Sequence, residues 1–182
     1  YQTDRTVITM DPGMAFGSGS HDTTQLCLKF LDGLNLSGMD VLDMGCGSGI
    51  LSIAALLLGA KSVSAADIDQ LAVKIAHENA ALNGCDDERL TIRCGNVLDD
   101  PALADEIGEK SYDVIVANIV ADIIKAMASL FARYLKEDVT LVVSGIISAR
   151  AEEVTSHLEQ HGFSVIELRE ENDWASAVLK RA

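Results

Sequence analysis

The chain has 182 residues, of which 48% are hydrophobic and 23% charged, and this composition suits one folded domain with a sizeable core. The formal net charge of −14, without a local basic patch, argues against direct binding of nucleic acid, because phosphates would be repelled. No apolar run reaches the length of about 18 residues that a transmembrane helix needs, so we expect no association with a membrane.

Short β-rich runs alternate with helical runs along the chain. A short strand is expected at residues 4–10, and a polar, acidic connection at 96–111. Leu71, Ile75 and Leu82 are expected on the inner side of one helix. In chain order, the alternating part is expected to contain a helix at 23–34, a strand at 39–45, a helix at 49–59, a strand at 61–67, a helix at 70–83, strands at 89–95 and 112–119, a helix at 122–135, a strand at 138–146, a helix at 149–161, and strands at 163–171 and 174–182.

This alternation is typical of a parallel sheet covered by helices on both faces. The last two strands have no helix between them, so we expect them to pair as an antiparallel hairpin at the edge of the sheet. The sequence therefore predicts an α/β fold with a doubly wound, mostly parallel, seven-stranded sheet. No linker or repeat interrupts residues 1–182, which we expect to form one domain.

The four cysteines form no Cys-x-x-Cys pair and accompany no histidine cluster, so we expect packing residues and no metal site. Scattered thiols in a chain without a signal peptide indicate a cytoplasmic protein. Tyr1 stands where an initiator Met would be, which indicates a fragment of a longer protein.

A ligand of such a sheet binds beyond the carboxyl ends of its strands. Three glycines, Gly45, Gly47 and Gly49, follow the strand at 39–45 and allow close approach of the backbone to a ligand. Asp67 ends the next strand, where its carboxylate can accept hydrogen bonds from a ribose diol. A glycine-rich turn followed by such an acid is typical of nucleoside binding in doubly wound folds.

Two details favour a cationic nucleoside over a dinucleotide. The glycine spacing is G-x-G-x-G rather than G-x-G-x-x-G, and Asp43 precedes the first glycine by two residues. A carboxylate there would repel a pyrophosphate. The same carboxylate would stabilise the sulfonium and ammonium groups of S-adenosylmethionine, either directly or through the loop, so Asp43, Gly45, Gly47 and Asp67 are expected cofactor residues.

The segment GMAFGSGSHDTT contains no Lys or Arg and is expected to form a second wall of the same pocket. Gly17 permits close backbone approach, Phe16 covers the cofactor, and Thr24 contacts its carboxylate or caps the following helix. The alternative is a structural turn in which both threonines serve only as caps. His21 is either a general base or, as we favour, a residue that packs over the cofactor or orders the loop.

Two asparagines complete the expected site. Asn118 ends the strand at 112–119, where its carbonyl can receive the hydrogens of a target amine, although an asparagine there can also be a helix cap. Amino-group methyltransferases often carry Asn-Pro-Pro-Tyr at this place, whereas this chain has Ile-Val-Ala after the asparagine. Asn96, directly after the strand at 89–95, is a further expected cofactor residue.

Several segments together resemble the PrmA family, the bacterial methyltransferases of ribosomal protein L11. The segments are DPGMAFGSGSHDTTQLCL, DMGCGSGILSIAALLLGA, ADIDQLAVKIAHENAALNG, VIVANIVAD, LVVSGI and ENDWASAVLKRA. The resemblance implies a class I, Rossmann-like methyltransferase that uses S-adenosylmethionine and releases S-adenosylhomocysteine. It also implies cofactor contacts at Thr24, Gly45, Asp67 and Asn118.

The resemblance further implies the substrate, which is a ribosomal protein of the large subunit, methylated on lysine side chains and on its N-terminal amine. Family members carry a separate substrate-recognition domain before the catalytic one, and we expect it to be absent from this chain. Three alternatives remain open: a class I methyltransferase acting on another protein or a small molecule, a nicotinamide-dependent oxidoreductase, and a non-catalytic module that binds S-adenosylmethionine. A methyl-transfer assay and a binding scan of both cofactors would separate them.

Overall fold

The computed structural model describes residues 5–11 and 19–182, which contain one seven-stranded sheet and the helices that cover it. The elements are α1 (Asp22–Gly33), β1 (Asp40–Met44), α2 (Ile50–Leu57), β2 (Ser62–Asp67), α3 (Gln70–Leu82), β3 (Leu90–Cys94), α4 (Pro101–Gly108), β4 (Tyr112–Asn118), α5 (Ala121–Ala126), α6 (Ala128–Tyr134), β5 (Leu135–Ile147), the 3-10 helix η1 (Ser148–Arg150), α7 (Ala151–Gln160), β6 (Phe163–Glu171) and β7 (Trp174–Arg181).

The strand order is β3-β2-β1-β4-β5-β7-β6. The first five strands are parallel, and β7 runs antiparallel to both β5 and β6. The predicted doubly wound sheet with an antiparallel edge hairpin is therefore confirmed. Strand order reverses between β1 and β4, and in open parallel sheets the ligand crevice lies at this reversal, beyond the carboxyl ends of the strands.

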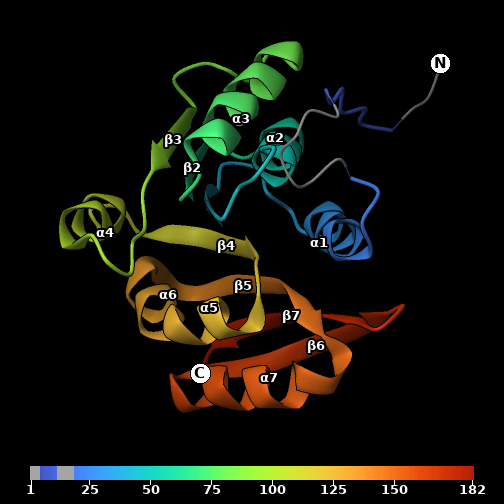
Figure 1. Ribbon diagram of the computed structural model, residues 1–182, viewed down its shortest axis with the longest axis vertical. Helices are drawn as coiled ribbons and strands as arrows, with labels where there is room; N and C mark the ends of the chain where they lie inside the picture. The colour runs from blue at the N-terminus through green and yellow to red at the C-terminus, as the bar shows by residue number, and fades with distance from the viewer. Residues whose placement is uncertain (1–4, 12–18) are drawn as a thin grey trace.

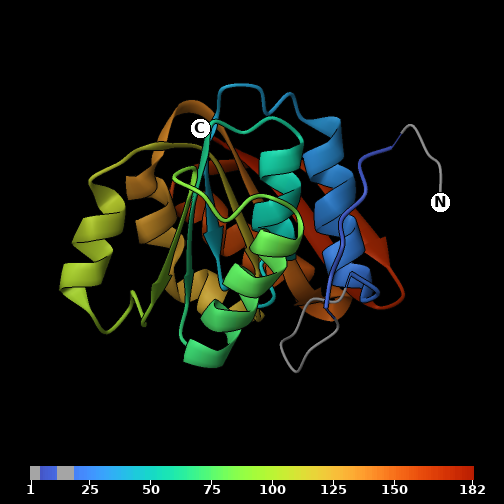
Figure 2. The ribbon, with the colours of Figure 1, turned by 90° about the horizontal axis from the view of Figure 1, so that it is seen from above.

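Successive strand residues alternate between two hydrophobic cores, one on each face of the sheet. On β4, Val114 and Val116 join the core formed with α1, α2 and α3, whereas Ile115 and Ala117 join the core formed with α4 to α7. Helices α1 to α3 lie on one side of the strands, and α5, α6 and α7 on the other (Figure 1). In Figure 2 the helices α1, α2 and α3 lie in front of the sheet, side by side on the face that they cover.

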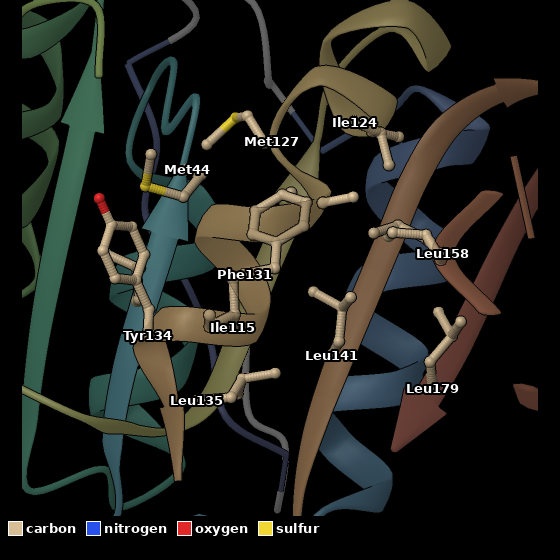
Figure 3. Packing of buried hydrophobic residues seen from close by; sticks show 14 of the residues in the cluster. Met44, Ile115, Ile124, Met127, Phe131, Tyr134, Leu135, Leu141, Leu158 and Leu179 are labelled. Atoms are coloured by element: carbon tan, nitrogen blue, oxygen red, sulfur yellow. The ribbon is translucent and has the colours of Figure 1, made fainter. Parts of the chain in front are cut away.

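The core on the α4 to α7 face is centred on aromatic side chains of α6. Phe131 and Tyr134 are fully buried and pack with Ile115 and Leu141 from the strands beneath them (Figure 3). The buried Tyr134 hydroxyl donates a hydrogen bond to the carbonyl of Ala104 at 2.9 Å, which ties α6 to α4. This satisfied hydroxyl allows a tyrosine to be buried without the cost of an unpaired polar group.

The structure differs from the sequence expectations in three elements. Residues 5–11 form no strand, because the side chains of Asn79 and Asn83, and not a neighbouring strand, bind the backbone of this segment. The acidic connection at 96–111 contains α4, whose first turn is capped by the Asp100 side chain. The helix expected at 122–135 is divided into α5 and α6.

The inner face of α3 also differs from the expectation. Leu71 and Leu82 are 44% and 56% exposed, whereas Ile75 is buried as predicted. The buried positions include Ala76 and Asn79, so α3 turns a face of small and polar residues toward the rest of the molecule. Among the helices that the structure describes, none combines the length and the apolar character needed to cross a membrane.

Replacing Phe131 with alanine should lower the free energy of unfolding by about 3–5 kcal/mol, because it leaves a cavity in a fully buried core. Urea denaturation measures this loss. The control is Ser129→Ala, an exposed position of the same helix, which should change the free energy by less than about 0.5 kcal/mol. Equal effects of the two substitutions would contradict the packing described here.

Candidate active site

A cavity of about 380 Å³ lies beyond the carboxyl ends of β1, β2, β3 and β4. Five residues that the sequence predicted for the site line it together: Gly45, Gly47, Asp67, Asn96 and Asn118. The rest of the lining comprises Met44, Ala66, Ile68, Gly95, Val97, Leu98, Ile119, Val120, Ile123 and Met127. Asp67 is therefore the only charged residue among the described residues of the wall, and no cation is present there to hold a phosphate.

The first wall of the cavity is the turn between β1 and α2, residues 45–49, which we call the glycine loop. Gly45 has a φ of 75°, and a Cβ at this position would lie 2.3 Å from Cγ2 of Ile119. Gly49 has a φ of 81°, and its Cβ would lie 3.0 Å from Cβ of Ala76 on α3. Glycine is required at both positions because the backbone is left-handed and a neighbour occupies the side-chain space.

Asp67 at the end of β2 holds the glycine loop from the side. Its Oδ2 accepts a hydrogen bond from the Gly47 amide at 2.8 Å, and its Oδ1 accepts one from the Asp69 amide at 2.9 Å. Each carboxylate oxygen can accept a further bond, so the oxygens that line the cavity keep acceptor capacity for ligand hydroxyls. Asp67 thus fixes the loop and presents a negative group to the cavity.

Asp43 lies beneath the glycine loop, fully buried, and does not line the cavity. Ser52 on α2 donates a hydrogen bond to its Oδ2 at 2.6 Å, while Oδ1 has no hydrogen-bond partner among the described residues. Burial raises the pKa of the Asp43 carboxyl from 3.8 to about 6, the Ser52 hydrogen bond opposes this rise, and the negative charge of Asp67 adds to it. Of the two routes considered for Asp43, the structure supports an influence through the loop.

A second, smaller cavity of about 260 Å³ adjoins the first. It is lined by His21, Thr23, Asn118, Ile119, Val120, Gly145 and Trp174. The His21 and Trp174 rings meet edge to face, with centroids 5.1 Å apart. The exposed surface of this wall is largely apolar, and Ile119, Val120 and Trp174 contribute hydrophobic side chains to it.

His21 is the N-cap of α1. Its Nδ1 accepts a hydrogen bond from the Thr23 amide at 3.3 Å and lies 2.9 Å from Oγ1 of Thr23. With Nδ1 engaged in the cap, the geometry favours an ordering role for His21 over a role as general base. The alternative in which both threonines serve only as caps is not observed, because His21 is the N-cap of α1.

Asn118 lies in the wall shared by the two cavities. Its Nδ2 donates to Oγ1 of Thr24 on α1 at 3.2 Å, while its Oδ1 is buried without a hydrogen-bond partner among the described residues. Leaving a buried acceptor unpaired costs about 1–3 kcal/mol, so this oxygen is a candidate for a donor that a ligand brings. Asn118 does not cap a helix, because the N-cap of α5 is Val120.

Asn96 is positioned by a local turn after β3. Its Oδ1 accepts from the Leu98 amide at 3.1 Å, and its Nδ2 donates to Asp99 at 2.5 Å. The turn places Asn96 in the cavity wall beside Val97 and Leu98.

Three predicted residues are not among the described residues that line the two cavities. Thr24 is fully buried and lies behind Asn118 rather than in either cavity wall. Phe16 and Gly17 lie outside the described residues. Sequence reasoning did not single out Ile119 or Trp174, because an isoleucine after a strand and a tryptophan in a hairpin carry no local signal of a binding site.

Comparisons with known proteins agree with this geometry. A family model described as "Ribosomal protein L11 methyltransferase (PrmA)" matches residues 1–182. The ribosomal protein L11 methyltransferase of Ruminiclostridium cellulolyticum is 46% identical over 177 residues, which are 97% of this chain and 54% of that protein. The ribosomal protein L11 methyltransferase of Thermoanaerobacter pseudethanolicus is 43% identical over 180 residues, which are 99% of this chain and 55% of that protein.

A crystal structure of the ribosomal protein L11 methylase from Lactobacillus delbrueckii subsp. bulgaricus is similar to this fold. Its TM-score is 0.88 at 35% sequence identity, and the match covers 100% of this chain and 90% of that one. The chain spans about half the length of the curated relatives that it matches.

The buried Asp43 carboxyl should give the stability of the protein a specific pH dependence. Its pKa is higher in the folded protein than in the unfolded chain, so between about pH 4 and 6 the folded state binds more protons and stability falls as pH rises. From pH 4 to 7, the wild-type free energy of unfolding should fall by about 2 kcal/mol relative to that of Asp43→Asn. Urea denaturation of both proteins across this pH range tests the prediction. Parallel profiles of unfolding free energy against pH would contradict it.

Proposed function

The chain belongs to the PrmA family of ribosomal protein L11 methyltransferases, and from this membership we propose that it transfers methyl groups from S-adenosylmethionine to amino groups of ribosomal protein L11. The amino groups are lysine side chains and the N-terminal amine. The single observation that carries the proposal is the position of Asn118, which lines both a nucleoside-sized cavity and an apolar one and whose buried side-chain oxygen has no hydrogen-bond partner among the described residues.

The larger cavity fits S-adenosylmethionine, which when bound would supply an activated methyl group on a positively charged sulfur. Asp67 would hold the ribose hydroxyls, and the loop glycines Gly45 and Gly47 would let the backbone approach the ligand closely. The wall carries one negative charge and no positive one among its described residues, which suits a cationic ligand without phosphates. The same charge pattern disfavours a nicotinamide dinucleotide.

The smaller cavity fits the acceptor amine. An ammonium has no lone pair, so the amine must lose a proton before it attacks the methyl carbon. Ile119, Val120 and Trp174 provide apolar surroundings that disfavour the charged form and lower the pKa of a lysine placed there. Asn118 would accept a hydrogen bond from the amine and so orient the lone pair of the amine nitrogen, and solvent would take the proton. Positioning and desolvation would then supply most of the rate enhancement.

The proposal also covers the partner and the location. A protein substrate, rather than nucleic acid, is supported by the net charge of −14, which suits a basic protein. We propose a cytosolic location, which is supported by the ribosomal substrate named for the relatives and by the free thiols of Cys27, Cys46, Cys85 and Cys94.

Replacing Asp67 with alanine should weaken S-adenosylmethionine binding at least about tenfold, because hydrogen bonds to a charged group contribute about 1.5–3 kcal/mol each. Isothermal titration calorimetry measures the dissociation constant. Glu88→Ala is the control, since Glu88 is an exposed acid that does not line the cavity. An affinity unchanged by Asp67→Ala would place the ribose elsewhere.

Replacing Asn118 with alanine should lower kcat about tenfold or more while the dissociation constant for S-adenosylmethionine changes about twofold or less, because the lost hydrogen bond is to the amine. The assay follows the transfer of a radiolabelled methyl group to purified large-subunit ribosomal proteins. Label on L11 with the wild-type chain supports the proposed function. Label on a different protein, or on none, would overturn it, and full activity of Asn118→Ala would remove the proposed role of Asn118.

A further inference from the structure

Asn79 of α3 and Asn83, which directly follows α3 as its C-cap, bind the backbone of the N-terminal segment, residues 5–11. Asn83 binds Thr9 twice: its Oδ1 accepts from the Thr9 amide at 2.8 Å, and its Nδ2 donates to the Thr9 carbonyl at 2.7 Å. Asn79 binds Asp11, whose amide donates to Oδ1 of Asn79 at 2.9 Å. The segment is thus held along α3 through its main chain, so its side chains do not determine these contacts.

Asn79 makes a second contact that Asn83 does not. Its Nδ2 donates at 3.0 Å to the carbonyl of Ser48, which lies inside the glycine loop. The orientation of the Asn79 amide is fixed by its partners, because the Asp11 amide can only donate and the Ser48 carbonyl can only accept. One side chain therefore joins the N-terminal segment to the loop that lines the larger cavity.

The bridge lies in a closely packed, buried part of the molecule. Asn79 is fully buried, and Ser48 is 3% exposed. One turn before Asn79, Ala76 contacts Gly49, where the absent Cβ would lie 3.1 Å from the Ala76 Cα. The glycine loop is thus packed against α3 at Ala76 and hydrogen-bonded to it at Asn79, and a shift of the loop would displace the Asn79 amide.

We propose that Asn79 is a positioning residue that couples docking of the N-terminal segment to the conformation of the glycine loop. Through this coupling, a ligand that fixes the loop strengthens the hold of α3 on residues 5–11, and by linkage a docked segment raises the affinity for that ligand. The inference rests on the proposed binding of S-adenosylmethionine at the loop. It assigns Asn79 no contact with the ligand, because Asn79 does not line the cavity.

The two asparagines allow a crossed experiment with amide hydrogen exchange measured by NMR, with and without saturating S-adenosylmethionine. Each amide is followed in a variant that keeps its own acceptor: Thr9 in Asn79→Ala, and Asp11 in Asn83→Ala. In the wild-type chain, the ligand should slow exchange of both amides about two- to tenfold, the range expected for one hydrogen bond. In Asn79→Ala the Thr9 amide should lose this response, whereas in Asn83→Ala the Asp11 amide should keep it.

Asp11→Pro tests the coupling through Asn79 a second time, without changing any buried side chain. It removes the amide that donates to Asn79, at an exposed position, and should abolish the response of the Thr9 amide to the ligand. Calorimetry on the same samples should show weaker binding in Asn79→Ala, by about two- to tenfold, and a change below about twofold in Asn83→Ala.

The outcomes separate this inference from the proposed function. A wild-type chain that binds no S-adenosylmethionine overturns both. If the wild-type chain binds it and the Thr9 amide still responds in Asn79→Ala or in Asp11→Pro, the coupling through Asn79 is wrong and the proposed function stands. A purely structural role of Asn79 would lower stability without removing the response of the Thr9 amide.

Discussion

The site depends on how the glycine loop is held from several sides. The amide of Gly45 donates to the Ala66 carbonyl on β2 at 2.8 Å, Asp67 binds the next glycine, and Asn79 binds the loop from α3. Each contact needs a backbone that passes within van der Waals distance of its neighbours, which a side chain on Gly45 would prevent. Because these neighbours belong to different elements, the shape of the cavity follows from the packing of α2, α3 and β2 around one turn.

Charge is distributed around this turn in two layers. Asp67 faces the cavity and uses both carboxylate oxygens to bind backbone amides, so it is held in place and retains acceptor capacity. Asp43 lies below the loop in a fully buried position, where ionisation is costly; among the described residues, Ser52 donates to one carboxylate oxygen and the other has no partner. A buried carboxylate beneath a cavity whose described lining holds no positively charged side chain lowers the electrostatic potential there and favours a positively charged ligand.

Asn118 connects the larger cavity, proposed for the cofactor, to the smaller one, proposed for the acceptor amine. Its Nδ2 donates to Thr24 on α1, and its buried oxygen has no hydrogen-bond partner in the part of the chain that the structure describes. Helix α1 is in turn fixed to the sheet, because the Ser144 hydroxyl on β5 donates to the Thr23 carbonyl at 3.0 Å. The apolar surface contributed by Trp174 comes from β7, so the antiparallel hairpin at the end of the chain completes the smaller cavity.

The sequence by itself determined the α/β fold, the antiparallel edge and five residues of the cavity wall, because alternation, glycine spacing and polar residues at strand ends are local patterns. Only the tertiary structure decided that Asp43 and Thr24 lie behind the walls and that residues 5–11 form no strand. It also revealed the contacts of Asn79 and Asn83, whose partners are 31 to 74 residues away along the chain. An asparagine on a helix has no local pattern that identifies such partners, since packing of distant segments brings them within hydrogen-bond distance.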